Sequence, residues 1–128
     1  MKTSKLPVKV FHAACKFKLL NNTINYNSKK ITDGVSSDIW YVKTDQNREF
    51  CIKRALAKLA VKEDWYAPIN RNKFEAMYFQ NCFEIAPNNF PKLLGHDNKN
   101  YILAMEWYSP KNFVVWKKKI TQQKDRKR

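Results

Sequence analysis

The stretch DIWYVKTDQNREFCIK, residues 38–53, decides the fold of this chain. Both of its ends, residues 38–44 and 50–53, are rich in the β-branched and aromatic side chains that favour strands. Between them, residues 45–48 are polar and form a tight connection. Two strands joined so closely are antiparallel neighbours, so the stretch predicts a β-hairpin.

The second strand of this hairpin carries Lys53 on the face that it shares with Cys51. Side chains alternate between the two faces of a strand, so Phe50 and Ile52 point the other way. A lysine in this position can leave the apolar layer and neutralise phosphates in a cleft, while a helix carboxylate holds its ammonium group in place. Glu75, in the next predicted helix, is the candidate carboxylate. Taken alone, the two residues are more simply interpreted as solvated surface charges.

That next helix is long and is predicted to begin near Asn70, after Pro68. Apolar side chains recur along it at helical spacing, and we expect them to line one face that packs on the sheet. These side chains are Phe74, Met77, Tyr78, Cys82 and Phe83.

A second hairpin is predicted further along the chain. Its strands are residues 92–94 and 101–106, and its connection runs through Gly95 and residues 96–98. A polar segment that ends at Ile31 precedes the first hairpin, and no strand is located within it.

Helices are expected at both ends of the chain. The N-terminal helix lies within residues 4–20, ends at Asn21 and Asn22, and has an apolar face of Val8, Phe11, Cys15 and Leu19. A last helix is expected in residues 113–123. The fold predicted from these elements is an α+β domain, with an antiparallel sheet of about five strands, one long packing helix, and flanking N- and C-terminal helices.

The composition bounds the function classes. A chain of 128 residues, 44% of them hydrophobic, fits one packed domain. Its net charge of +14 attracts phosphates, whether on nucleotides, nucleic acids or membrane surfaces. The three cysteines lack the spacing of a metal site, so no metal ligand is assigned and reduced thiols are expected. No apolar run reaches the roughly 18 residues that span a bilayer, so we expect a cytoplasmic protein without a membrane partner.

Five segments, in the same order, resemble the aminoglycoside phosphotransferase family, whose members have a protein-kinase-like fold. They are residues 32–40 (TDGVSSDIW), 53–59 (KRALAKL), 71–75, 93–97 with 104–106, and 116–117. The resemblance covers residues 31–117 and implies three parts. An N-terminal helix and lead-in are residues 1–30, a kinase-like N-lobe with its hinge is residues 31–108, and the start of a C-lobe helix with a basic tail is residues 109–128.

The resemblance also implies a nucleotide site. Its residues would be Ser36, Ser37, Lys53, Glu75, Met105, Glu106 and Tyr108. The two serines would lie over the phosphates of ATP or GTP, the lysine would contact those phosphates, and the glutamate would orient the lysine. The backbone near Glu106 and Tyr108 would meet the adenine base, and Mg²⁺ would accompany the nucleotide as co-substrate. From the residues alone, the serines could instead complete a turn, and the methionine could be ordinary core.

The family places its catalytic aspartate, metal ligands and acceptor pocket in a second lobe beyond the hinge. After Tyr108 the sequence has no HxD segment, and its one carboxylate side chain is Asp125. We therefore expect a truncated lobe with no catalytic residue of its own and no phosphoryl-transfer turnover in isolation. Its expected partners are a nucleotide and either a separate C-lobe polypeptide or a second copy of the chain.

The charge leaves a different hypothesis open, a protein that binds nucleic acid or another anionic surface. Basic side chains crowd into residues 117–128, and exposed aromatic side chains could stack on bases. A third hypothesis is a noncatalytic regulatory module that binds proteins. We rank the phosphotransferase lobe first, because basic chain ends are usually solvated.

Overall fold

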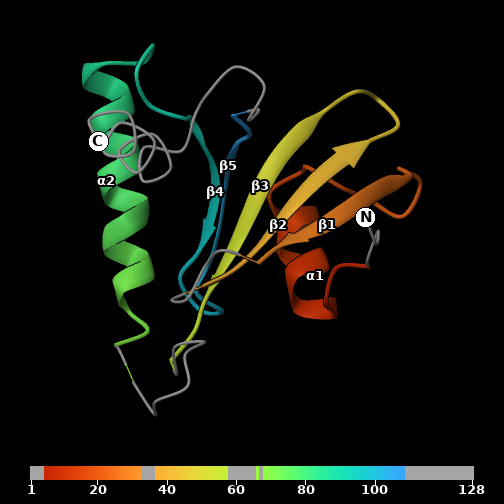
Figure 1. Ribbon diagram of the computed structural model, residues 1–128, viewed down its shortest axis with the longest axis horizontal. Coiled ribbons are helices and arrows are strands. Elements are labelled where there is room, and N and C mark those ends of the chain that lie inside the picture. Colours follow the sequence, from red (N-terminus) through yellow and green to blue (C-terminus); the bar gives the residue numbers. More distant parts are fainter. Residues whose placement is uncertain (1–4, 33–36, 58–65, 67, 109–128) are drawn as a thin grey trace, which may run out of the picture.

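The computed structural model describes residues 5–32, 37–57, 66 and 68–108 (Figure 1). The elements in chain order are α1 (Val8–Lys16), β1 (Tyr26–Ile31), β2 (Ser37–Thr44), β3 (Glu49–Ala55), α2 (Arg71–Ile85), β4 (Leu93–Asp97) and β5 (Ile102–Glu106). The strands form one antiparallel sheet in the order β1-β2-β3-β5-β4. The predicted α+β class and five-stranded antiparallel sheet are therefore confirmed. The expected helix of residues 113–123 lies outside the described residues.

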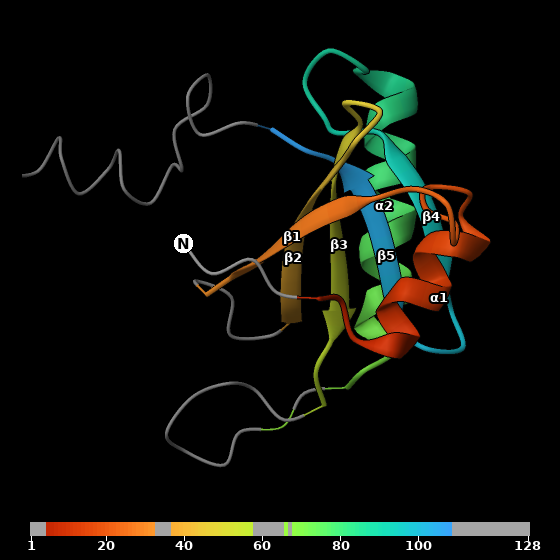
Figure 2. The same ribbon diagram turned by 90° about the vertical axis from the view of Figure 1, so that its right-hand side faces the viewer.

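The two helices cover opposite faces of the sheet. Figure 1 shows α2 on one side of the strands and α1 on the other, and in Figure 2 α1 is near the viewer with α2 behind the strands. The larger core lies on the α1 face and includes Val10, Ala13, Ala14, Trp40, Val42, Phe50, Ile52, Ile102 and Ala104. The α2 face holds a smaller cluster of Cys51, Ala76, Leu103 and Met105, flanked by Ile39, Phe79, Leu93 and Trp107.

The first hairpin forms as predicted, with β2 and β3 antiparallel and a turn between Thr44 and Glu49. The Thr44 N–H donates to the Arg48 carbonyl at 2.9 Å, which closes the turn. Asn47 takes the left-handed conformation at φ 59°, which asparagine tolerates better than most residues.

The second hairpin differs from the prediction, because Gly95, His96 and Asp97 are part of strand β4 and not of the connection. The turn lies between Asp97 and Ile102 and places Tyr101 at φ 59°. Gly95 does not have a positive φ. Its missing side chain serves packing instead, because a Cβ atom there would lie 2.2 Å from Cγ of Phe17.

Strand β1 is the element that the sequence analysis did not locate. It pairs along one side only, with β2, and is an edge strand of the sheet. Its sequence YNSKKI has two lysines and little apolar content. Charged side chains are common on edge strands because they discourage pairing with other chains. This polar composition lacks the apolar pattern from which a strand is predicted.

The N-terminal helix is shorter than predicted and turns a different face to the core. It ends before Lys18, which adopts a positive φ, while the Leu19 N–H donates to the Ala14 carbonyl at 2.9 Å. This left-handed C-terminal cap closes the helix ahead of the expected end at Asn21. Val8, predicted to face the core, is 69% exposed, whereas Val10 is fully buried.

Helix α2 forms where predicted, but its apolar stripe was assigned to the wrong face. Phe74, Met77 and Tyr78 are 63%, 48% and 57% exposed, and the buried positions are Asn72 and Ala76. Cys82 and Phe83 are half-buried, as expected for the sheet-facing side. Aromatic and apolar residues occur on every side of this helix, so periodicity alone could not select the packed face.

Candidate functional site

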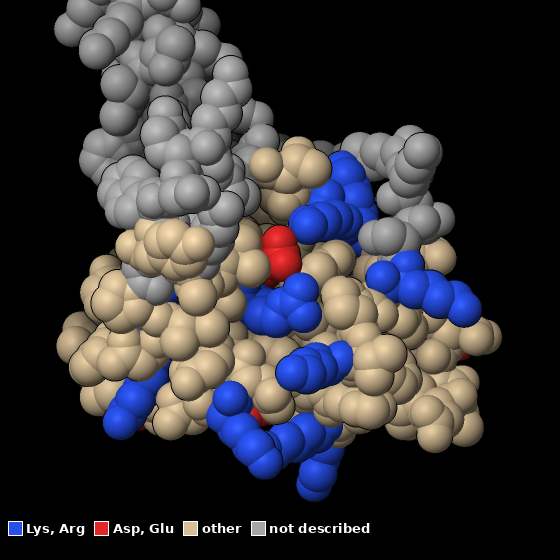
Figure 3. All heavy atoms as spheres, turned by 90° about the horizontal axis from the view of Figure 1, so that it is seen from below, with Lys and Arg blue, Asp and Glu red and all other residues tan. Residues whose placement is uncertain are grey.

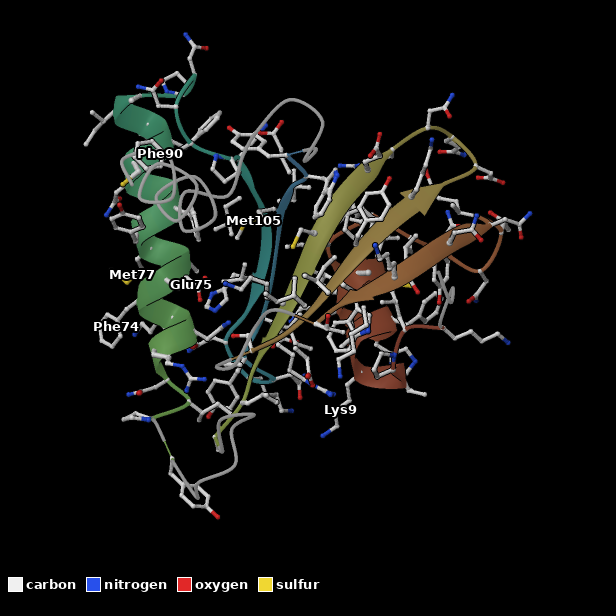
Figure 4. The ribbon with its side chains drawn as sticks, in the orientation of Figure 1. Lys9, Phe74, Glu75, Met77, Phe90 and Met105 are labelled. Carbon is white, nitrogen blue, oxygen red and sulfur yellow. The ribbon has the colours of Figure 1, made fainter. Side chains whose placement is uncertain are left out.

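The central feature of the α2 face is an ion pair between β3 and α2. Lys53 Nζ donates a hydrogen bond to Glu75 Oε1. The two side chains are 19% and 29% exposed, so the pair lies at the rim of the helix–sheet interface with access to solvent. Figure 4 shows Glu75 on the side of α2 that faces the sheet, with Phe74 and Met77 on the outer side.

Glu75 is positioned by contacts at the start of α2. Arg71 Nη2 donates to the Leu56 carbonyl at 2.6 Å, and Arg71 Nη1 donates to the Pro68 carbonyl at 2.8 Å. These bonds tie the first turn of α2 to the chain just after β3. Glu75 lies one turn further along the same side of the helix, which brings its carboxylate over the strand that carries Lys53.

The side chains around the pair are mainly apolar. Lys53 lies opposite Ile39 of β2 and Leu103 of β5, and its neighbours two residues along are Cys51 and, across the strands, Met105. Burial raises the pKa of the Cys51 thiol to about 11, with smaller opposing effects of Lys53, which lowers it, and Glu75, which raises it. The thiol therefore stays protonated at neutral pH and is not a nucleophile.

The structure describes one of the two serines that the resemblance implies. Ser36 lies outside the described residues. Ser37 is the first residue of β2, is 7% exposed, and pairs with Ala55. Since residues two apart share a face of a strand, Ser37 is a diagonal neighbour of Lys53 on the α2 face.

The three hinge residues lie at the end of β5. Met105 is buried against α2 at 8% exposure, whereas Glu106 points to the other side of the strand and is exposed. The Glu106 N–H donates to the Lys92 carbonyl at 3.0 Å, and Glu106 Oε1 accepts from the Lys92 N–H at 2.7 Å. Tyr108 follows two residues later and is 36% exposed. The three therefore share a segment but not a face.

A pair of aromatic rings that the sequence analysis did not single out lies near this end of the face. The rings of Tyr41 and Trp107 are 4.6 Å apart between centroids. The Tyr41 hydroxyl donates to Glu49 Oε2 at 2.6 Å, which fixes the ring in place. The alternation of side chains along β2 predicts that Tyr41 shares a face with Ile39. Its contact with Trp107 depends on tertiary packing, which no local pattern predicts.

No protein-family model matches the chain, and no curated protein matches it either. Family membership therefore stays a proposal that depends on the geometry of the chain's own residues. In the part of the chain that the structure describes, no helix is long and apolar enough to span a membrane, and no group of three or more His, Cys, Asp or Glu residues could hold a metal ion. The basic residues 117–128, on which the nucleic-acid hypothesis depends, lie outside the described residues.

A histidine of β4 contacts the first turn of α2. His96 Nε2 and Asn72 Oδ1 are 2.9 Å apart, and Asn72 is 1% exposed, so this bond joins β4 to the first turn of α2. Burial lowers the pKa of His96 from its usual 6.5, and the nearby Asp97 opposes part of that effect. The folded protein therefore disfavours the protonated imidazole more than the unfolded chain does.

The consequence is a pH-dependent stability. Between pH 6.5 and the lower pKa of His96 in the folded protein, the unfolded state binds more protons than the folded state. The contribution of neutral His96 to the free energy of unfolding is therefore complete above pH 6.5 and is lost as the pH falls from 6.5 through the folded pKa. We expect His96→Gln, which keeps a hydrogen-bond donor but does not titrate, to weaken the pH dependence of the free energy of unfolding. Urea titrations at pH 5 to 8 measure the free energy of unfolding of both proteins. The same change of this free energy with pH in the wild type and in His96→Gln would contradict the expectation.

Proposed function

We propose that this chain is the nucleotide-binding lobe of an ATP-dependent phosphotransferase of the aminoglycoside phosphotransferase type. The observation that carries the proposal is the Lys53–Glu75 pair, with the lysine on the third strand and the glutamate on the helix that follows it. In protein kinases the lysine of strand β3 contacts the phosphates of ATP, and a glutamate of the next helix holds that lysine. This chain has the same two residue types on the same two elements.

The energetics favour a binding role for the pair over a folding role. An ion pair with access to solvent contributes only about 0–1 kcal/mol to stability. The same ammonium group, already held in one orientation by Glu75, can form charge-assisted hydrogen bonds to phosphate worth about 1.5–3 kcal/mol each. Pre-orientation lowers the entropy lost when the ligand binds.

The rest of the α2 face fits a nucleoside. Leu103, opposite Lys53, and Met105, the first residue of the hinge segment, are two residues apart on this face of β5, which corresponds to roughly 7 Å of strand. Ile39, Tyr41 and Trp107 are half-buried and offer apolar surface along this span. The N–H of Glu106 is committed to Lys92, so hydrogen bonds to the base would come from other backbone groups of residues 106–108.

Calorimetric titration of the full chain tests this proposal. We expect ATP with Mg²⁺ to bind at least about tenfold more tightly than AMP, because AMP cannot place a β- or γ-phosphate on Lys53. ATP should also bind more tightly than inorganic tripolyphosphate, which has the charge but no base for the hinge segment. Equal affinity for ATP and tripolyphosphate, or no binding of either, would contradict a nucleotide site.

A further inference from the structure

A second concave site lies on the opposite side of the sheet from the Lys53–Glu75 pair. A cavity of about 350 Å³ separates α1 from the turn between β4 and β5. Its polar lining is Lys9, His12, Lys16, Asp97, Lys99 and Asn100. The three residues from α1 are spaced three or four apart, so they form one stripe along the helix that faces the turn.

The cavity has excess positive charge. Its lining has three lysines and one carboxylate, that of Asp97, which is buried at 5% exposure. Asp97 Oδ1 accepts from the backbone N–H groups of Lys99 and Asn100, and Oδ2 accepts from Asn100 Nδ2, at 2.9, 3.1 and 3.0 Å. The carboxylate thus shapes the turn, and these bonds help hold its pKa below the usual value despite burial.

Stability accounts for Lys16, which lies in the last turn of α1, where a cation favours the helix dipole, and whose charge helps lower the pKa of Asp97, but it does not account for Lys9 and Lys99. The ion pairs between described residues are Lys30–Asp38, Arg54–Asp38 and Lys53–Glu75, so Lys9, Lys16 and Lys99 are not ion-paired with a carboxylate in the described part of the chain. Lys9 lies in the first turn of α1, which has no acidic residue, and a cation there opposes the helix dipole. Figure 4 shows Lys9 at the lower end of α1, and Figure 3 shows basic side chains prevailing over acidic ones on the lower face of the molecule.

We propose that this cavity binds a small phosphorylated molecule through its phosphate or diphosphate group. Lysines from two elements, α1 and the turn after β4, line the cavity and can supply several hydrogen-bond donors to the oxygens of such a group, and the surplus positive charge matches its negative charge. The lining has no Phe, Tyr or Trp, and its one aromatic ring is the imidazole of His12, so it offers little of the stacking surface on which single-stranded nucleic acids bind. The site is separate from the nucleotide face, because α1 and α2 cover opposite faces of the sheet.

The test is an NMR titration of the full chain with inorganic pyrophosphate, using the Asn100 amide as the reporter. The variant Lys9→Gln/Lys16→Gln/Lys99→Gln removes the cavity's cations. The matched control, Lys43→Gln/Lys73→Gln/Lys92→Gln, removes three exposed lysines elsewhere. Both variants have the same net charge. All six lysines are exposed, so both variants should keep the wild-type circular dichroism spectrum.

We expect the Asn100 amide shift to saturate with pyrophosphate. The pyrophosphate concentration at half-saturation should rise at least about tenfold in the cavity variant and change by less than about twofold in the control. Equal weakening in both variants would show a diffuse charge effect and overturn the proposal, as would a shift that does not saturate. A single-stranded oligonucleotide that binds here more tightly than pyrophosphate would overturn it in favour of nucleic acid. The same titration in Lys53→Met should be unchanged, so failure here is distinguishable from failure of the nucleotide site.

Discussion

Lys53→Met is expected to weaken ATP binding by roughly 10- to 150-fold, because it removes at least one charge-assisted hydrogen bond worth about 1.5–3 kcal/mol. Methionine keeps a long unbranched side chain, so the packing beside Ile39 and Leu103 should change little. Glu75 loses its partner but keeps access to water at 29% exposure, so the fold should tolerate the change. Calorimetric titration with ATP and Mg²⁺ measures the loss.

The matched control for this variant is Arg54→Gln, the next residue of the same strand. Arg54 carries the same charge and also contacts a carboxylate, with Nη2 3.1 Å from Asp38 Oδ2. It points to the opposite face, where its guanidinium lies 5.6 Å from the ring centre of Trp40. We expect ATP affinity to change less than about twofold in Arg54→Gln. Similar losses in both variants would mean that ATP responds to the overall charge and not to a site.

Gly95→Ala is expected to destabilise the protein by about 1–3 kcal/mol, which lowers the thermal midpoint by roughly 5–15 °C. The added Cβ would lie 2.2 to 2.7 Å from three ring carbons of Phe17, too close for any real contact. Cγ, the nearest of them, is where the ring joins its side chain, so the whole ring has to move and the C-terminal end of α1 with it. Thermal unfolding followed by circular dichroism measures the effect.

A double-mutant cycle with Phe17→Ala separates this clash from any intrinsic cost of alanine in β4. Removing the ring makes room for the new methyl group, so Gly95→Ala should cost much less in the Phe17→Ala background. An equal cost in both backgrounds would mean that the close approach of Phe17 is not the reason for glycine at this position.

The sequence was sufficient where local patterns decide the structure. Strand alternation put Lys53 on the face of Cys51 and away from Phe50 and Ile52, and the structure agrees. A short polar turn was enough to predict that β2 and β3 are antiparallel neighbours. Helical spacing located α2, and with it Glu75, close enough to the strand for an ion pair.

The sequence was insufficient where a tertiary neighbour decides. Gly95 was expected in a turn because glycine favours turns, but its role is set by Phe17, a residue far away in the chain. The contact of Asn72 with His96 likewise joins elements whose approach no local pattern encodes. Phe74 and Met77 fit a packed face by spacing, yet the sheet contacts the neighbouring side of α2.

The most direct measurement of the central claim is a map of amide chemical-shift changes on adding ATP and Mg²⁺ to the isotope-labelled chain. A nucleotide held by the Lys53–Glu75 pair should shift residues 51–53, Glu75 and the hinge segment 105–108 together, with one common dissociation constant. Changes confined to the cavity beneath α1, or no saturable change on the α2 face, would contradict the account.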